Sequence, residues 1–346
     1  MNPIDRTAVI TGGNSGLGLE CARALLQQQP AWHVVIASRN RERSEAAVAD
    51  LRGSGGTGTV DARALDLGSL ADVRRFADTL LADLRGAALP PLRALVCNAG
   101  LQFTHRTASA DGFEATFAVN HLGHYLLTHR LVGALVPPAR IVFVGSGTHD
   151  PAERTGMPHP NYRGARALAD AAADGGDADP GRFGRRAYTT SKLCNVLFAY
   201  ELSRRLRASG LSTPDAPITV NAFDPGLMPG TGLGRDYPGW LKVVWNYVLP
   251  VLTILPKVHS ARTSGRNLAW VVSDPSLEHT TAKYFRRREA IPSSKDSYDG
   301  ALAHELWEES APLVGLEPDE SALSMNGAPP PPPHAEDHLA TALPPE

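Results

Sequence analysis

Near its N-terminus the chain of 346 residues reads Thr7-Ala8-Val9-Ile10-Thr11-Gly12-Gly13-Asn14-Ser15-Gly16-Leu17-Gly18. The part before the glycines is a β-branched run, which is typical of a strand. A helix is expected to begin near Leu19. Glycines let the backbone approach a pyrophosphate, and a helix N-terminus offers it free N–H groups, so this order predicts a dinucleotide site. Because the spacing is Gly-x-x-x-Gly-x-Gly rather than the commoner Gly-x-Gly-x-x-Gly, a helix-start loop with incidental glycines remains the alternative interpretation.

The second expected strand, His33–Ser38, is followed directly by Arg39. In folds that bind NAD, an acidic residue near this point bonds the ribose 2′-hydroxyl, whereas an arginine accommodates the 2′-phosphate of NADP. No acidic residue follows the strand before Glu42. We therefore expect NADP(H) as the cofactor, and a solvated arginine at a helix start is the alternative.

Further strands and helices are expected to alternate along the chain. The strands are Val60–Leu67, Ala94–Cys97, Arg140–Val144, Ile218–Phe223 and Tyr284–Phe285, and the helices are Asn40–Leu51, Ser69–Leu84, Asp111–Leu135, Gly164–Ala173 and Ser260–Val272. Asn98-Ala99-Gly100 follows one of these strands, and Ser146 follows another. Both therefore stand at strand ends, where an open α/β sheet admits its ligand.

Tyr188 and Lys192 are four residues apart, at the start of an expected helix that runs to Arg207. This spacing places both side chains on one helix face. A lysine ammonium beside a phenol favours the phenolate, so we expect the pair to exchange a proton with a substrate during a hydride transfer. A chance pairing of the two residues in an ordinary helix is the alternative.

The composition excludes several classes of protein. A formal net charge of −2, without a basic stripe, gives no electrostatic case for nucleic acid. Cys21, Cys97 and Cys194 lie in apolar segments, and no apolar signal core precedes the first strand. These features favour a reducing cytoplasm as the location. His121 and His124 are three residues apart but lack a third ligand of matching pattern, so we expect no metal.

Two segments stand apart from the α/β pattern. Leu241–Leu255 is the most apolar stretch, but Asn246 and Pro250 interrupt it and it is too short to span a bilayer. We consider a substrate-covering lid within residues 227–258, a contact with a partner or a membrane surface, and plain core. Residues 317–346 include five consecutive prolines and are expected to form a disordered tail.

The glycine turn, Asn-Ala-Gly, the strand-end serine and Tyr-x-x-x-Lys, in this order, resemble the short-chain dehydrogenase/reductase family. The resemblance covers residues 7–316 and implies one domain of the Rossmann type. Its parallel sheet has seven strands in the order 3-2-1-4-5-6-7, with helices on both faces.

The resemblance also implies a role for each matching residue. Gly12, Ser15, Gly16, Leu17 and Gly18 would hold the pyrophosphate, Arg39 the 2′-phosphate, Asp66 and Leu67 the adenine, Asn98, Ala99 and Gly100 the middle of the cofactor, and Pro225 and Gly226 the nicotinamide. Tyr188 would transfer the proton, and Lys192 would bind the nicotinamide ribose and tune Tyr188. Ser146 would orient the reacting group, and Asn120 would hold a water in the proton relay.

Within the family, the sequence most resembles retinol dehydrogenases and light-dependent protochlorophyllide oxidoreductase. The segments that carry this similarity are Val96–Ala99, Asp111–Glu114, Asn120–His124, Ser191–Asn195 and Val272–Leu277. The pigment enzyme usually has a tyrosine where this chain has Gln102 and a cysteine where it has Leu227. Both departures fall near the expected substrate pocket, and the cofactor residues are unaffected.

These features lead to one main functional hypothesis. The protein is expected to be an NADP(H)-dependent oxidoreductase that acts on a hydrophobic carbonyl, alcohol or activated alkene. Light-dependent reduction of protochlorophyllide is the second hypothesis, and a non-catalytic NADP-binding protein is a third. A long insert before Tyr188 stands beside the helix that relatives use for oligomer contacts, so we expect a monomer rather than a homodimer.

Overall fold

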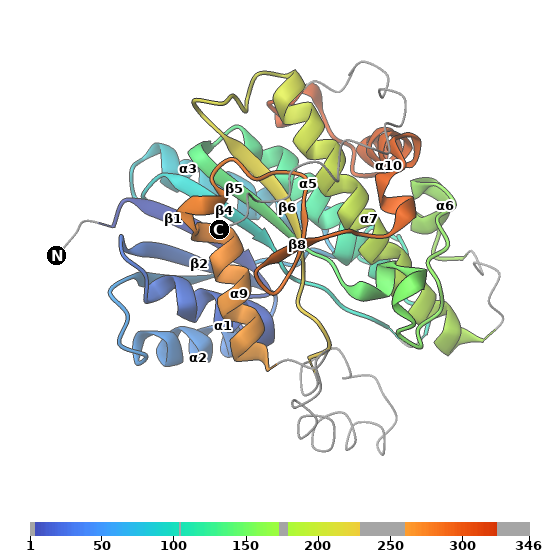
Figure 1. Cartoon of the computed structure of the whole chain (residues 1–346), viewed down its shortest axis with the longest axis horizontal. Coiled ribbons are helices and arrows are strands. Elements are labelled where there is room, and N and C mark those ends of the chain that lie inside the picture. Colours follow the sequence, from blue (N-terminus) through green and yellow to red (C-terminus); the bar gives the residue numbers. More distant parts are fainter. Residues whose placement is uncertain (1–3, 104, 173–178, 229–259, 324–346) are drawn as a thin grey trace, which may run out of the picture.

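The glycine turn joins a strand to a helix, as expected. In the computed structural model, β1 (Arg6–Thr11) ends at this turn and α1 (Gly16–Leu26) begins within it (Figure 1). The structure describes residues 4–103, 105–172, 179–228 and 260–323. Of the side chains in β1, Val9 faces one apolar core, while Ala8 and Ile10 face another. A strand buried on both faces is what a parallel sheet between two helical layers requires.

Eight strands form one sheet in the order β3-β2-β1-β4-β5-β6-β7-β8. Besides β1 they are β2 (Trp32–Ser38), β3 (Thr59–Ala64), β4 (Leu92–Cys97), β5 (Leu135–Val144), β6 (Ile218–Asp224), β7 (Tyr284–Arg286) and β8 (Glu289–Ile291). All neighbours are parallel except β7 and β8, which form an antiparallel pair. The expected sheet order is confirmed for the first seven strands, and β8 extends it by one edge strand that sequence analysis missed.

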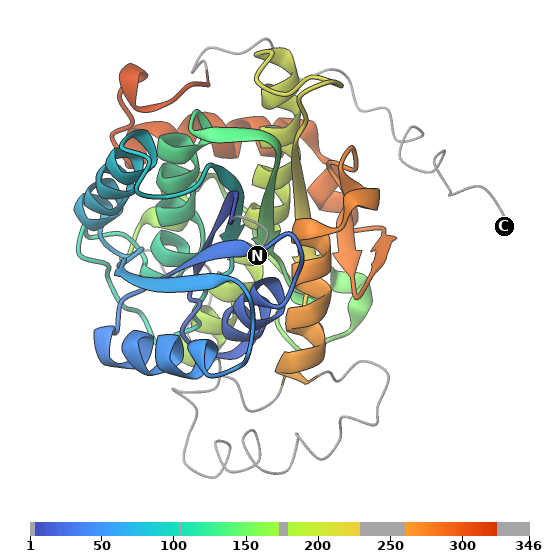
Figure 2. The ribbon, with the colours of Figure 1, turned by 90° about the vertical axis from the view of Figure 1, so that its left-hand side faces the viewer.

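Helices cover both faces of the sheet (Figures 1 and 2). One layer contains α1, α2 (Arg41–Arg52) and α9 (Ala261–Ser273), and the other contains α3 (Leu70–Arg85), α5 (Gly123–Val132), α7 (Pro180–Ala208) and α10 (Gly300–Leu313). Shorter pieces are α4 (Ala115–Phe117), α6 (Ala165–Ala169), 3-10 turns at Gly147–His149, Pro151–Glu153, Pro275–Leu277, Lys295–Tyr298 and Pro318–Glu320, and a π-helical turn at Ala118–Leu122. The doubly wound α/β class is confirmed.

Side chains at the N-caps explain why several helices begin where they do. Asn40 accepts a hydrogen bond from the Arg43 N–H at the start of α2, and Ser69 does the same for Asp72 at the start of α3. Asp179 accepts from two N–H groups of α7, and Pro180 occupies the first helical position. Such caps satisfy backbone donors that have no partner within the helix.

The expected helix Asp111–Leu135 is wrong in extent. The chain instead forms α4, the π-helical turn and α5, and Gly133 ends the helix. β5 then begins at Leu135, earlier than the predicted Arg140, and contains Pro137 and Pro138. The apolar residues continue from the helix into the strand, so the apolar pattern alone did not separate the two. The two prolines, which are unfavourable inside a helix and favour extended backbone, were the signal for the strand.

Other boundaries also differ from the sequence predictions. α7 begins at Pro180, so it includes residues assigned to the connection before Tyr188. β3 ends at Ala64 rather than Leu67, and α6 covers only part of Gly164–Ala173. The apolar segment Leu241–Leu255 lies outside the described residues, and so does most of the region assigned to a lid.

The C-terminal boundary lies beyond the predicted Leu316. Glu320 accepts hydrogen bonds from Arg74 at 2.8 Å and from Arg130 at 2.9 Å, on α3 and α5 respectively. Leu323 is buried in the core between the sheet and these helices. Residues 317–323 are therefore part of the folded domain, and the remainder of the predicted tail lies outside the described residues.

Candidate active site

A cleft of about 1400 Å³ opens at the carboxyl ends of β1, β2, β4, β5 and β6. It is lined by fifteen of the residues that the sequence singled out: Gly12, Ser15, Gly16, Leu17, Arg39, Asp66, Leu67, Asn98, Ala99, Gly100, Ser146, Tyr188, Lys192, Pro225 and Gly226. Gly18 and Asn120 are not among the lining residues, and both are buried. The structure therefore brings the predicted cofactor and catalytic residues together around one space.

The glycine turn shows why side chains are excluded from this part of the cleft. Gly12 and Gly16 have positive φ angles of 66° and 55°, which L residues rarely adopt. A Cβ on Gly18 would lie 2.6 Å from Asn98 Nδ2 and 2.7 Å from the carbonyl oxygen of Gly12. This close backbone packing leaves a cradle in front of the α1 N-terminus that fits a pyrophosphate.

The ends of β1 and β4 are joined by a hydroxyl group. Thr11 Oγ1 accepts hydrogen bonds from the N–H groups of Asn98 and Ala99, both at 2.9 Å. The same oxygen lies 2.9 Å from His124 Nε2, while Asn98 Nδ2 donates to the Thr11 carbonyl at 2.7 Å. Sequence analysis did not identify Thr11 or His124 in this role, because the contacts join segments far apart in the chain.

Positive side chains gather at the end of β2. Arg39 and Arg43 both line the cleft, and the Arg39 side chain is 67% exposed, so it is free to approach a ligand. Asp66 lies across from Arg39, with 3.9 Å between its Oδ2 and Arg39 Nη1, and its Oδ1 accepts the Gly68 N–H. Glu42 does not line the cleft. Sequence analysis did not identify Arg43 as a site residue; it lies in the first turn of α2, where its N–H donates to the Asn40 cap.

Tyr188 and Lys192 lie on one face of α7, as the spacing predicted. Lys192 Nζ lies 5.5 Å from the centre of the Tyr188 ring and donates to the Val144 carbonyl at 3.0 Å. The lysine is buried, and burial lowers its pKa to about 8, although the charge of Asp224 acts in the opposite direction. The Lys192 ammonium therefore gives up its proton more readily than the ammonium of a solvent-exposed lysine.

Ser146 follows β5 and caps the 3-10 turn at Gly147–His149. Its Oγ accepts the Thr148 N–H at 3.3 Å and the Thr148 hydroxyl at 3.1 Å. Because these bonds use the lone pairs of Ser146 Oγ, its own proton is available for a substrate oxygen. The Ser146 carbonyl accepts from His149 Nδ1 at 2.7 Å, and His149 Nε2 accepts the Ser294 N–H at 3.0 Å.

Asn120 is fully buried in the π-helical turn. Its Oδ1 accepts the Leu101 N–H at 2.9 Å, and its Nδ2 donates to the Leu101 carbonyl at 3.0 Å and to Ser191 Oγ at 2.9 Å. The Asn120 side chain is thus fully used by protein groups, and its main-chain carbonyl lies 3.2 Å from His124 Nδ1.

An ion-pair network that the sequence did not reveal holds the segment after β6. Buried Asp224 accepts from the Gly226 N–H and from Arg286 Nε, both at 2.9 Å. Arg286 also donates to Glu153 at 2.9 Å. This network joins the Pro225-Gly226 turn to the chain beyond Ser146, because Glu153 belongs to that chain segment.

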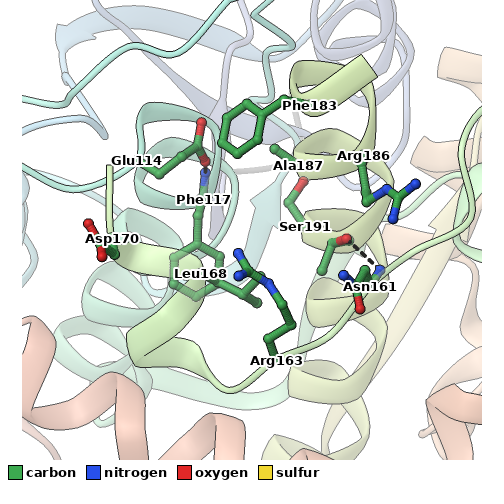
Figure 3. A pocket seen from close by; sticks show the side chains of 11 residues that line it. Glu114, Phe117, Asn161, Arg163, Leu168, Asp170, Phe183, Arg186, Ala187 and Ser191 are labelled. Atoms are coloured by element: carbon green, nitrogen blue, oxygen red, sulfur yellow. Dashed lines mark hydrogen bonds between the residues drawn. The ribbon is translucent and has the colours of Figure 1, made fainter. Parts of the chain in front are cut away.

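A second, much smaller pocket, of about 30 Å³ compared with about 1400 Å³ for the cleft, lies beside Ser191 (Figure 3). Glu114, Arg163 and Arg186 contribute charged side chains to it. The Glu114 carboxylate is committed to the N–H groups of Thr116 and Phe117. None of the predicted catalytic residues lines this pocket, so the large cleft is the candidate active site.

The described residues contain no cluster of three or more histidine, cysteine or acidic side chains suited to a metal. His121 and His124 do not share a partner: His121 Nε2 lies 3.0 Å from Ser310 Oγ, whereas His124 contacts Thr11. Within the described part of the chain, no helix is both long and apolar enough to cross a bilayer.

The fold and the cleft define an α/β oxidoreductase with a tyrosine–lysine pair and a strand-end serine at a dinucleotide cradle. A family model for short chain dehydrogenase matches residues 6–157. Dehydrogenase/reductase SDR family member 13 of Bos taurus is 35% identical over 92% of this chain and 76% of that protein. This chain therefore belongs to the short-chain dehydrogenase/reductase family, and the predicted resemblance is confirmed.

Other relatives match the branch expected from the sequence. Retinol dehydrogenase 13 of Homo sapiens is 33% identical over 90% of this chain and 85% of its own length. The chloroplastic protochlorophyllide reductase of Daucus carota is 33% identical over 90% of this chain and 78% of its own length. A crystal structure of an uncharacterized protein from Mycobacterium paratuberculosis aligns with a TM-score of 0.65 at 29% identity, over 91% of this chain and 95% of that one.

Proposed function

We propose that the protein is an NADP(H)-dependent oxidoreductase that interconverts a predominantly hydrophobic carbonyl compound and its alcohol. The observation that carries this proposal is the convergence of Ser146, Tyr188 and Lys192 on the cleft that also contains the glycine cradle. Leu227, Met228 and Ile291 line the same cleft and supply apolar surface for a substrate.

The residues present fit a phosphorylated dinucleotide. Gly12 and Gly16 line the cleft with positive φ angles, Gly18 packs directly against Asn98 and the Gly12 carbonyl, and the N-terminus of α1 faces the resulting cradle. Arg39 and Arg43 provide positive charge at the end of β2, where a 2′-phosphate is expected. This arrangement supports a preference for NADP(H) over NAD(H).

The bound nicotinamide would supply or accept the hydride. Ser146 Oγ would donate a hydrogen bond to the substrate oxygen, and Tyr188 Oη would give that oxygen its proton in reduction or remove it in oxidation. The positive charge of buried Lys192 favours negative charge on a neighbouring oxygen. Asn120 holds the Leu101 backbone beside these groups.

Tyr188→Phe tests the proposal directly. This variant should lose about 10²–10⁴-fold in kcat with NADPH and any accepted carbonyl, yet retain NADPH affinity measured by fluorescence titration. Tyr162→Phe is the matched control, because Tyr162 lies outside the cleft and its hydroxyl has no partner among the described residues. Unchanged turnover of Tyr188→Phe would exclude the proposed proton transfer.

Light-dependent reduction of protochlorophyllide is a second candidate function, favoured by the similarity to the carrot enzyme. Gln102 and Leu227 line the cleft at the two positions where this chain departs from the pigment enzyme. NADPH oxidation should therefore be measured in the dark with carbonyl compounds and then under light with protochlorophyllide. Turnover confined to the illuminated sample would favour this second function over the first.

A further inference from the structure

Gln102 lies in the wall of the cleft, and the described part of the chain offers its buried amide no hydrogen-bond partner. Its side chain is only 3% exposed, and neither Nε2 nor Oε1 has a hydrogen-bond partner among the described residues. No other described residue that lines the cleft has a buried side-chain nitrogen or oxygen in this condition. Burying a polar group without a hydrogen bond is unfavourable, so such groups need a physical explanation.

The backbone around Gln102 is held beside the catalytic groups. Leu101 is bonded through both its N–H and its carbonyl to the amide of Asn120. A Cβ on Gly100 would lie 3.2 Å from Lys192 Nζ, so the chain passes directly against the catalytic lysine just before Gln102. Gln102 follows these two anchored residues, and its backbone therefore has a fixed place relative to the reaction centre.

We propose that Gln102 determines substrate specificity by hydrogen-bonding a hydroxyl group of the substrate that is distinct from its reacting oxygen. This inference rests on the function proposed above and narrows the substrate to a hydroxylated, otherwise apolar carbonyl compound. A neutral amide offers one acceptor and two donor hydrogens, and a hydroxyl group both donates and accepts.

The glutamine side chain can meet such a ligand at little cost. Its torsions allow the amide to turn towards the cleft by a change of rotamer. Since the amide has no protein hydrogen bonds among the described residues, this movement breaks none. A substrate hydroxyl therefore gains a partner, whereas an analogue without one leaves the amide unpaired and should react less efficiently.

The test uses matched carbonyl compounds in a dark NADPH-oxidation assay. Each carbonyl skeleton, beginning with 1-tetralone and extending to linear and branched aldehydes, is supplied unsubstituted, with a ring or chain methyl group, and with a hydroxyl group at the same position. For at least one skeleton and position, the hydroxylated compound should have a kcat/KM about tenfold or more above its methyl counterpart.

Gln102→Met removes hydrogen bonding while keeping a side chain of similar length. This variant should lose the preference for hydroxylated compounds but change kcat/KM for the methyl counterparts less than about threefold. Gln27→Met is the matched control, because Gln27 is exposed at the end of α1 and does not line the cleft. Its preference should equal that of the wild type.

Thermal unfolding provides a readout that needs no substrate. Because Gln102 makes no hydrogen bond within the described structure, Gln102→Met should unfold at the same temperature as the wild type or higher. A clear fall in Tm would show that the amide has a structural partner and would overturn the proposal.

The outcomes separate this inference from the proposed function. If the wild type reduces no carbonyl in the panel, the proposed function and the inference both fail. If it reduces them without preferring hydroxylated forms, or if Gln102→Met retains the preference, only the inference fails. Loss of the preference in Gln102→Met supports the inference, provided that its Tm is equal to or above that of the wild type and the Gln27→Met control keeps the preference.

Discussion

The side-chain amide of Asn120 pairs with the main chain of Leu101 in both directions, at 2.9 Å and 3.0 Å. Such a pair resembles one step of a β-ladder formed by a side chain, and it leaves neither polar group of Leu101 exposed to the apolar interior. Since Asn120 also donates to Ser191, it joins the chain after β4 to α7. Asn120, a polar residue in an otherwise apolar helix, therefore anchors the backbone of a neighbouring segment.

Asn120→Ala should reduce both stability and activity. Both polar groups of Leu101 would lose their buried partner, so we expect the free energy of unfolding to fall by about 1–3 kcal/mol. Ser191→Ala removes only one of the three bonds and should cost less. Urea denaturation and kcat of the two variants check this order. Equal losses in both variants would contradict the assigned role of Leu101.

Lys192→Met should abolish most activity without a matching loss of stability at neutral pH. Burial lowers the lysine pKa from 10.5 to about 8, so the folded protein carries an unfavourable charge below pH 8. The difference corresponds to roughly 3 kcal/mol. The penalty fades between pH 8 and 10.5, because there the unfolded state binds the proton and the folded state does not.

Thermal unfolding of Lys192→Met and wild type at pH 7 and pH 10 measures this effect. At pH 7 the variant should be as stable as the wild type or more stable, and this relative advantage should shrink at pH 10. An advantage that grows with pH would mean that the lysine charge stabilises the fold.

Replacing Arg39 should change the choice between the two cofactors. If Arg39 binds the 2′-phosphate as proposed, Arg39→Ala removes a charge-assisted contact, so the Kd for NADPH should rise about 10- to 100-fold. Affinity for NADH should change little, because that cofactor lacks the phosphate. Arg41→Ala is a suitable control, since Arg41 pairs with Glu45 outside the cleft. Fluorescence titration would contradict the assignment if both cofactors weakened equally.

His149 should support catalysis through the backbone of Ser146. Its Nδ1 donates to the Ser146 carbonyl and its Nε2 accepts the Ser294 N–H, so one neutral tautomer satisfies both bonds. Burial lowers the His149 pKa, which favours this neutral form. His149→Ala should lower kcat, whereas His149→Asn should restore part of it, because the asparagine amide can still donate to Ser146. An asparagine variant no better than alanine would exclude this role.

Acid should destabilise the protein through three buried histidines of the helix that runs from the π-helical turn into α5. Burial lowers the pKa values of His121 and His129 to about 3 and that of His124 to about 4, from 6.5. As pH falls below 6.5 the unfolded chain binds protons that the folded chain does not, at about 1.4 kcal/mol per pH unit for each histidine. Urea denaturation at pH 7.5 and 5.0 should show this loss, and His121→Gln should reduce it.

Local patterns predicted most of the fold. The β-branched runs of β1 and β2 and the capping residue Ser69 are readable from neighbouring residues, so these elements were placed within a few positions. The break between α5 and β5 was missed, because Leu135 continues the apolar character of the helix although the chain has already turned at Gly133. β8 is too short to carry a pattern and exists through its pairing with β7.

The cleft was predicted to the extent that its residues stand at strand ends. Ser146 and Asn98 follow strands and therefore lie, with the glycine turn, at the carboxyl-terminal ends of the strands. The partners of these residues were not predictable in the same way. His124 on α5 meets Thr11 at the end of β1, and Arg286 meets Asp224 from a strand whose only sequence signal was two aromatic residues.

The turn at Pro318–Glu320 is held to the helical layer by one carboxylate between two arginines, Arg74 and Arg130. A Cβ on Gly133 would lie 3.0 Å from Ala322 Cβ, so this turn packs near the beginning of β5 rather than near its end. The cleft lies at the opposite, carboxyl-terminal ends of the strands. Ion pairs weaken as dissolved salt screens them. High ionic strength should therefore weaken the attachment of this turn to α3 and α5 without changing the geometry of the cleft. A fluorophore on the turn should then report increased mobility of the turn while kcat stays unchanged.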